Sequence, residues 1–177
     1  MNARKRSRQG VAYAILLCFA LVQPVSAGSD RTLEKGFVDA LRYDGSAHRQ
    51  ARAGKAIRAY KAAGVLPQRP RRQDYTDYYV VRKPTTFMGN PVVMVVEEYM
   101  GAYVGCCVNP GAGVYVRVTG SIEAMHDFAR LNRCRVEEYP DRKALLVVVP
   151  AGLAMPPGKY AALLCQESDE EEAAAAG

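Results

Sequence analysis

Short segments rich in valine and tyrosine fill most of the chain between Thr76 and Cys165, and they constrain its fold more than any other feature. β-Branched and aromatic residues favour strands, while the glycine, proline and asparagine between these segments favour turns. We expect seven strands, at Thr76–Arg82, Pro91–Met100, Ala102–Val108, Val114–Val118, Arg135–Tyr139, Ala144–Val149 and Lys159–Cys165. Their mostly short connections indicate antiparallel pairing.

One helix is expected between the fourth and fifth strands. Ser121 is a suitable N-cap, and apolar residues repeat at helical spacing from Ile122 to about Asn132. The order ββββαβββ predicts an α+β fold, an antiparallel sheet with one packed helix. We expect a hairpin loop at Asn109–Ala112, and we interpret the glycines of Gly111–Gly113 as turn residues.

The segment before these strands is basic and predicts a helical arm. We expect helices at Leu33–Tyr43 and from about Ala47 to Ala63, with Ser46 as the N-cap of the second and Gly64 at its end. One face of the second helix is apolar, formed by Ala53, Ala56, Ile57, Tyr60 and Ala63. Its other faces carry the candidate residues for contact with an anionic surface: Arg52, Lys55, Arg58 and Lys61.

The apolar face of this second helix is mostly alanine, so it buries little area. We therefore favour a helix that rests on its own domain or is partly disordered, with contact to a membrane surface or a partner as the alternative. Two prolines and three arginines follow within residues 66–72, and proline disfavours helix in the residue before it. This composition predicts an extended linker.

The first 27 residues have the pattern of a secretory signal peptide. Four basic residues precede an apolar run of 12 residues, Val11–Val22, and small residues follow at Val25–Ala27. A membrane-spanning helix needs about 20 apolar residues, so this run favours export over anchoring. We expect an exported protein, periplasmic or extracellular, with no transmembrane helix in its mature chain.

Export changes the charge of the working protein. The whole chain has 24 basic and 18 acidic residues, a net charge of +6. Without residues 1–27 it has 20 basic and 18 acidic residues, a net charge of +2. The nucleic-acid interpretation loses its support, although residues 28–72 remain strongly basic.

These patterns divide the chain into five parts. They are a signal peptide (1–27), a basic helical arm (28–64), a Pro/Arg linker (65–73), a disulfide-stapled α+β domain (74–166) and a disordered acidic tail (167–177).

The mature chain keeps four cysteines, an even number that indicates disulfides in an exported protein. Neighbouring strand residues point to opposite faces of a sheet, so Cys106 and Cys107 should reach different partners. We expect the pairs Cys106–Cys165 and Cys107–Cys134. A bond between Cys106 and Cys107 together with Cys134–Cys165 is an alternative, and free thiols or a metal site are others.

No motif of this chain specifies an enzyme. Cys106 or Cys107 with His126 has the residue types of a thiol nucleophile, but export favours oxidised cysteines. Glu97 and Glu98 are consecutive in an expected strand, so their carboxylates should lie on opposite faces. We expect no catalytic residues, no metal and no cofactor, and we interpret His126 as a surface residue of its helix.

Tyrosines mixed with carboxylates are the best candidates for a binding surface, because tyrosine is enriched at interfaces. The candidates are Tyr75, Tyr78, Tyr79, Tyr99 and Tyr103. We expect an exported, non-catalytic binding or envelope-associated protein whose partner is an unidentified protein or envelope component, not nucleic acid. One alternative is an envelope thiol, redox or hydrolytic enzyme that uses Cys106 and Cys107. The other is an electrostatic binder of anionic envelope surfaces through residues 31–72, with peripheral membrane contact.

Overall fold

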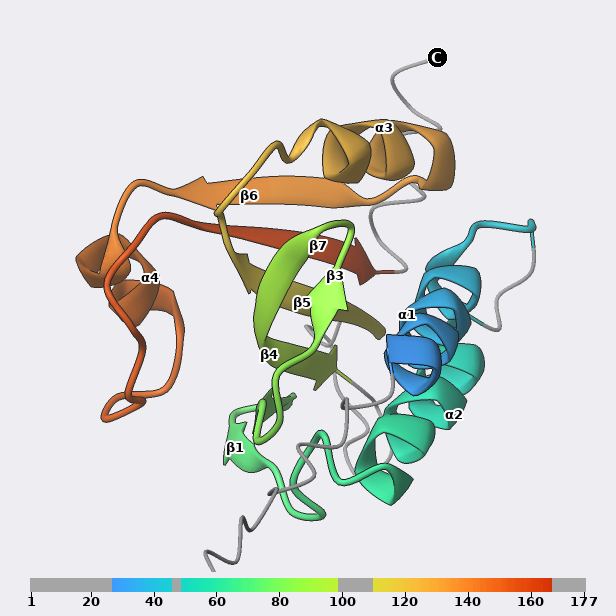
Figure 1. Cartoon of the computed structure of the whole chain (residues 1–177), viewed down its shortest axis with the longest axis horizontal. Coiled ribbons are helices and arrows are strands. Elements are labelled where there is room, and N and C mark those ends of the chain that lie inside the picture. The colour runs from blue at the N-terminus through green and yellow to red at the C-terminus, as the bar shows by residue number, and fades with distance from the viewer. Residues whose placement is uncertain (1–26, 46–48, 99–109, 167–177) are drawn as a thin grey trace, which may run out of the picture.

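The computed structural model describes residues 27–45, 49–98 and 110–166. An antiparallel sheet lies at the centre, with helices on both of its faces (Figure 1). The helices are α1 (Ala27–Leu41), α2 (Arg49–Ala62), α3 (Glu123–Asn132) and α4 (Arg142–Val148). The strands are β1 (Arg71–Gln73), β2 (Thr76–Val80), β3 (Thr86–Phe87), β4 (Asn90–Glu98), β5 (Gly111–Arg117), β6 (Arg135–Tyr139) and β7 (Tyr160–Gln166).

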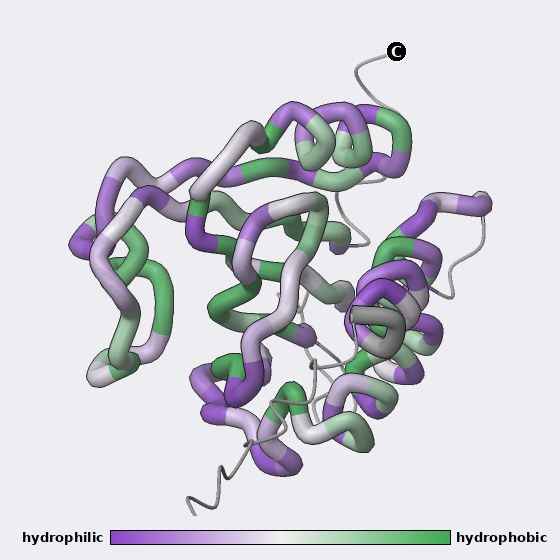
Figure 2. Tube along the Cα trace, viewed as in Figure 1, coloured by the Kyte–Doolittle hydropathy of each residue, from purple (hydrophilic) through white to green (hydrophobic). Residues whose placement is uncertain are grey.

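The sheet confirms the predicted α+β class. Its strand order is β1-β2-β4-β5-β7-β6, with the short β3 paired to β4, and every neighbouring pair is antiparallel. The neighbouring strands β5 and β7 lie inside the sheet, consist mainly of small and aliphatic residues and are buried almost throughout. Figure 2 shows this apolar centre and the hydrophilic segment around β1.

One face of the sheet is covered by α1, α2 and α3, and we call it the helical face. Its core joins Phe37 and Leu41 of α1, Ile57 and Tyr60 of α2 and Phe128 of α3 to inward side chains of the strands. The expected apolar face of α2 is buried here except for Ala63, which lies beyond the end of the helix and is exposed. Both helices of the basic segment therefore belong to the main core.

The opposite face is partly covered by α4 and the segment that follows it, and we call it the second face. The helix α4 corrects an expectation, because we expected a strand at Ala144–Val149. Asp141 caps this helix by accepting a hydrogen bond from the Ala144 backbone N–H at 2.9 Å. Leu145 is fully buried whereas Val147 is 84% exposed, so the valines of this run do not alternate into a sheet.

The first part of β5 corrects a second expectation. Gly111 and Gly113 are strand residues that pair with β4 and β7, not turn residues of a hairpin. The expected strand Ala102–Val108 lies outside the described residues. Ile122, and not the expected Ser121, occupies the N-cap position of α3, and no side-chain hydrogen bond caps the helix there. The Ser121 hydroxyl accepts a hydrogen bond from the Glu123 backbone N–H at 3.1 Å, just before the helix.

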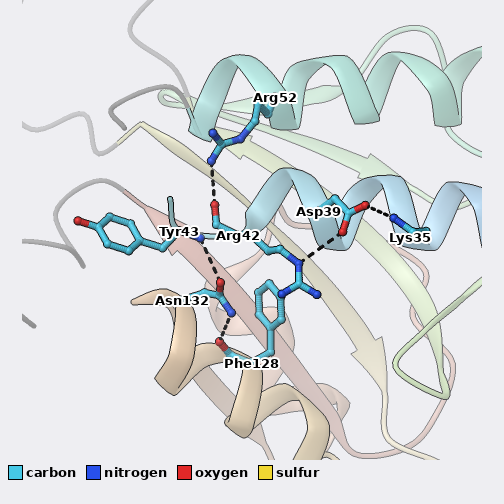
Figure 3. A network of polar contacts seen from close by, with 7 residues as sticks. All are labelled: Lys35, Asp39, Arg42, Tyr43, Arg52, Phe128 and Asn132. Atoms are coloured by element: carbon cyan, nitrogen blue, oxygen red, sulfur yellow. Dashed lines mark hydrogen bonds and ion pairs between the residues drawn. The ribbon is translucent and has the colours of Figure 1, made fainter. Parts of the chain in front are cut away.

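A network of polar contacts connects the end of α1 to α3 (Figure 3). The buried Asn132 side chain accepts a hydrogen bond from the Tyr43 backbone N–H at 3.1 Å and donates to the Phe128 carbonyl at 2.8 Å. Arg52 of α2 donates to the Arg42 carbonyl at 2.8 Å. These bonds fix the segment after α1 between the two neighbouring helices. Among the described residues, no helix is long and apolar enough to cross a membrane.

Candidate anion-binding site

The strand β1 places two neighbouring arginines on opposite faces of the sheet. Arg71 pairs with Tyr78 of β2, and Arg72 pairs with Asp77. Directly opposed residues of an antiparallel pair share a face, and consecutive residues alternate between faces. The segment that we expected to be a linker thus contributes an edge strand whose two arginines have different surroundings.

On the helical face, the positive charge of Arg72 is balanced by the carboxylate of Asp77. Its guanidinium donates two hydrogen bonds to the Asp77 carboxylate, at 2.7 and 2.9 Å, and the Asp77 side chain is only 5% exposed. Tyr79 donates to the same carboxylate at 3.3 Å, and Lys61 of α2 donates to the Tyr79 hydroxyl at 3.0 Å. Such a satisfied bidentate pair is a structural contact that joins β1, β2 and α2.

Glu97 lies beside this network because it pairs directly with Asp77 across β2 and β4. Glu98 lies on the other face and accepts a hydrogen bond from Gln166 at 2.7 Å. Burial raises the pKa of Glu97, and the nearby Lys61 opposes this effect. Asp77 and Glu97 are therefore the carboxylates that lie side by side on the helical face. They are neighbours because of the register in which β2 pairs with β4.

We expect Glu97→Gln to stabilise the fold at neutral pH. Because burial raises the folded-state pKa above the unfolded one, protonation favours folding, and stability is lost as pH rises through the folded-state pKa. Glutamine cannot ionise, so the variant should keep the stability that the wild type loses. The difference in stability between the variant and the wild type should become smaller at low pH. Thermal unfolding measured over a series of pH values tests this. A variant less stable than the wild type at neutral pH would mean that the cations beside Glu97 outweigh its burial.

Arg71 lines a hollow on the other side of β1 that we call the arginine groove. It is open to solvent and has a volume of about 390 Å³. Its residues come from the segment before and within β1 and from β2 and its end: Pro67, Arg69, Pro70, Arg71, Tyr78, Val80, Val81 and Arg82. Among the described residues, the lining therefore includes three arginines and no aspartate or glutamate.

The three arginines of the groove differ from Arg72 in having no acidic partner. Within residues 27–45, 49–98 and 110–166, no ion pair or side-chain hydrogen bond involves Arg69, Arg71 or Arg82, and all three are exposed. Arginine presents several N–H donors in a planar fork that matches carboxylates, sulfates and phosphates. The groove thus offers three such forks beside the ring of Tyr78.

Comparisons with protein-family models, curated proteins and solved structures gave no significant match. The site is therefore interpreted from its own geometry.

The candidate tyrosines have different surroundings in the fold. Tyr78 is half-buried and lines the groove, whereas Tyr79 is buried on the helical face within the network of Asp77 and Lys61. Tyr75 is half-buried and does not line the groove. Tyr99 and Tyr103 lie outside the described residues.

The four cations expected on α2 do not form one binding surface. Arg52 pairs with Asp44, and Lys61 lies 4.2 Å from the centre of the Tyr79 ring. Lys55 and Arg58 are exposed, and Arg58 lies close enough to Glu97 to influence its pKa. None of the four lines the arginine groove.

The cysteines require a correction. Cys134 is bonded to Cys165, so the expected pairs Cys106–Cys165 and Cys107–Cys134 are both wrong. Cys165 lies on the helical face of β7, and Cys134 at the turn after α3 reaches it there. Cys106 and Cys107 lie outside the described residues. The bond that is present belongs to the alternative pairing.

His126 is a surface residue of α3. Its Nε2 atom lies 3.2 Å from the Glu138 carboxylate, and its side chain is 44% exposed. Within the described part of the chain, no group of three or more histidine, cysteine, aspartate or glutamate side chains could hold a metal ion.

Sequence reasoning missed Arg69, Arg71 and Arg82 as site residues. Arg69 and Arg71 lie in the proline- and arginine-rich run, which we interpreted mainly as a linker and only as part of residues 31–72 in the alternative electrostatic binder. The run continues into β1, and the pairing of β1 with β2 brings Arg82 close to the run. No local sequence pattern indicates that these residues lie near one another.

Proposed function

We propose that this protein is an exported, non-catalytic binding protein that holds an anionic ligand in the arginine groove. One observation carries the proposal: three arginines without an acidic partner in the described chain line one hollow that contains no carboxylate. Charge of one sign in a concave site raises the local concentration of ligands of opposite charge. An anionic polymer or surface of the cell envelope is the ligand that suits this site and an exported chain.

Two observations support export. The first 27 residues have the order of a signal peptide, and the described structure contains a disulfide, which persists in oxidising compartments. Detecting the protein in the periplasm or medium, with its amino terminus at Gly28, would test this part of the proposal. A full-length chain retained in the cytoplasm would refute it.

We expect the triple variant Arg69→Gln/Arg71→Gln/Arg82→Gln to lose most affinity for dextran sulfate. Each cationic contact to a polyanion releases counterions, so three lost contacts should reduce the slope of log affinity against log salt by about 2–3. Titration calorimetry at several salt concentrations measures both quantities. Glutamine is shorter than arginine but remains polar, and the three positions are exposed, so the fold should be retained.

A matched control separates the groove from net charge. The variant Arg31→Gln/Arg130→Gln/Lys143→Gln removes the same charge from exposed positions on α1, α3 and α4. It should change the affinity and its salt dependence much less than the groove variant. Equal losses in both variants would show that binding depends on overall charge, and the groove would have no special role.

A further inference from the structure

A second hollow adjoins the arginine groove on the second face of the sheet. It has a volume of about 130 Å³ and lies over the ends of β2, β4, β5 and β7. Tyr78 lines both hollows and is the residue that their linings share. The polar residues of the second hollow are Thr76, Tyr78, Glu98, Tyr115, Arg135 and Gln166.

Hydrogen-bond donors and acceptors are combined in this second hollow. Burial raises the pKa of Tyr115 to about 12 and also raises the pKa of Tyr78, so both hydroxyls keep their protons at neutral pH. The Glu98 carboxylate is oriented by the hydrogen bond from Gln166. Arg135 is oriented by Glu137, which accepts a hydrogen bond from its Nε at 2.9 Å.

Apolar surface lies between these polar groups. Val96 and Leu164 also line the second hollow, together with the rings of Tyr78 and Tyr115. A pyranose ring has a matching character, with apolar C–H faces and a rim of hydroxyls that both donate and accept hydrogen bonds. Aromatic rings with fixed polar groups around them provide both kinds of contact.

We propose that the two hollows form one site for an acidic oligosaccharide, with a sugar ring in the second hollow and ligand carboxylates in the arginine groove. This inference rests on the proposed function, because it assigns the groove's anions to a ligand that continues past Tyr78. A free phosphate or a short polyphosphate would use the arginines alone. The combination of hydroxyl-binding and anion-binding surfaces favours a sugar acid over these simpler ions.

The test compares ligands that share charge or sugar rings. The full exported chain is titrated with a short oligogalacturonate, with tripolyphosphate as a charged ligand without sugar, and with a malto-oligosaccharide as an uncharged sugar. We expect oligogalacturonate to bind about tenfold or more tightly than either control. Roughly one or two additional charge-assisted hydrogen bonds would give a gain in affinity of this size. Tripolyphosphate binding that equals or exceeds it would overturn the inference.

Variants then separate the two hollows. Thr76→Val/Glu98→Gln alters only the second hollow and should weaken oligogalacturonate about tenfold, by loss of hydrogen bonds, without weakening tripolyphosphate. The triple groove variant should weaken both ligands. If the second-hollow variant binds oligogalacturonate like the wild type, the inference fails while the proposed function stands. If the groove variant binds both ligands like the wild type, the proposed function fails as well.

Tyr78 provides a matched pair at the junction. Tyr78→Phe keeps the aromatic ring and should retain most of the oligogalacturonate affinity, whereas Tyr78→Leu removes the ring and should lose several-fold more. Thermal unfolding of each variant verifies that it is folded. Equal affinity of the two variants would contradict stacking of a sugar on this ring. Tighter binding of a single-stranded oligonucleotide than of oligogalacturonate would assign the site to nucleic acid and overturn the inference.

Discussion

Replacing both Cys134 and Cys165 by alanine is expected to lower the free energy of unfolding by about 3–4 kcal/mol. The bond joins residues 31 apart, and cutting it returns the entropy of an open loop to the unfolded chain. In the folded protein it connects the turn after α3 to the fully buried Cys165 of β7. Equilibrium urea unfolding followed by circular dichroism measures the loss.

Reduction of the wild-type protein provides the control for this prediction. A reductant should shift the wild-type unfolding midpoint toward that of the double variant. Any shift that the reductant still causes in the double variant must come from cysteines other than these two. An unchanged midpoint in the double variant would contradict the prediction and would mean that α3 and β7 are held together equally well by packing.

Gly113→Ala is expected to destabilise the protein by about 3 kcal/mol or more, because it overpacks a central strand. A Cβ atom at Gly113 would lie 2.6 Å from the Leu163 carbonyl oxygen and 2.5 Å from a methyl carbon of Leu164. The carbonyl belongs to β7, the neighbouring strand, so it can move only if the ladder between β5 and β7 distorts. Thermal unfolding should show a large decrease in midpoint.

The same substitution at Gly36 is the matched control. Gly36 lies in α1, and apart from the neighbouring backbone of its own helix no described atom lies within 4 Å of a new Cβ, so Gly36→Ala should stabilise the protein by about 0.5–1 kcal/mol. The two changes add one identical methyl group and should have opposite signs. A Gly113→Ala variant as stable as the wild type would show that β7 can move away from β5 without loss of pairing.

The glycines of β5 show where local sequence rules stop. Glycine favours turns, so Gly111–Gly113 indicated a hairpin. Both glycines instead allow close approach of the β7 backbone, since a Cβ at Gly111 would lie 2.4 Å from the Cys165 carbonyl oxygen. The residue type is the same in both situations, and only the distant strand distinguishes them.

The helix α4 was missed for a different reason. Its valines suggested a strand, yet the N-cap Asp141 was visible in the sequence and indicates a helix start. The β propensity of a short apolar run is strongly dependent on context. Here Leu145 is buried within the helix, Val147 and Val148 are exposed, and Val149 is buried just after the helix ends.

The sequence by itself determined the α+β class, the helices of the basic segment, the helix α3 and most of the strands. These features depend on periodicity, capping and turn residues within a few positions of one another. Tertiary structure decided the Cys134–Cys165 pair, the neighbouring carboxylates Asp77 and Glu97, and the different surroundings of Arg71 and Arg72. Each of these depends on which strands pair and in what register, and a shift of one residue reverses the face of every side chain. The arginine groove is therefore a product of strand pairing, although its arginines are plain in the sequence.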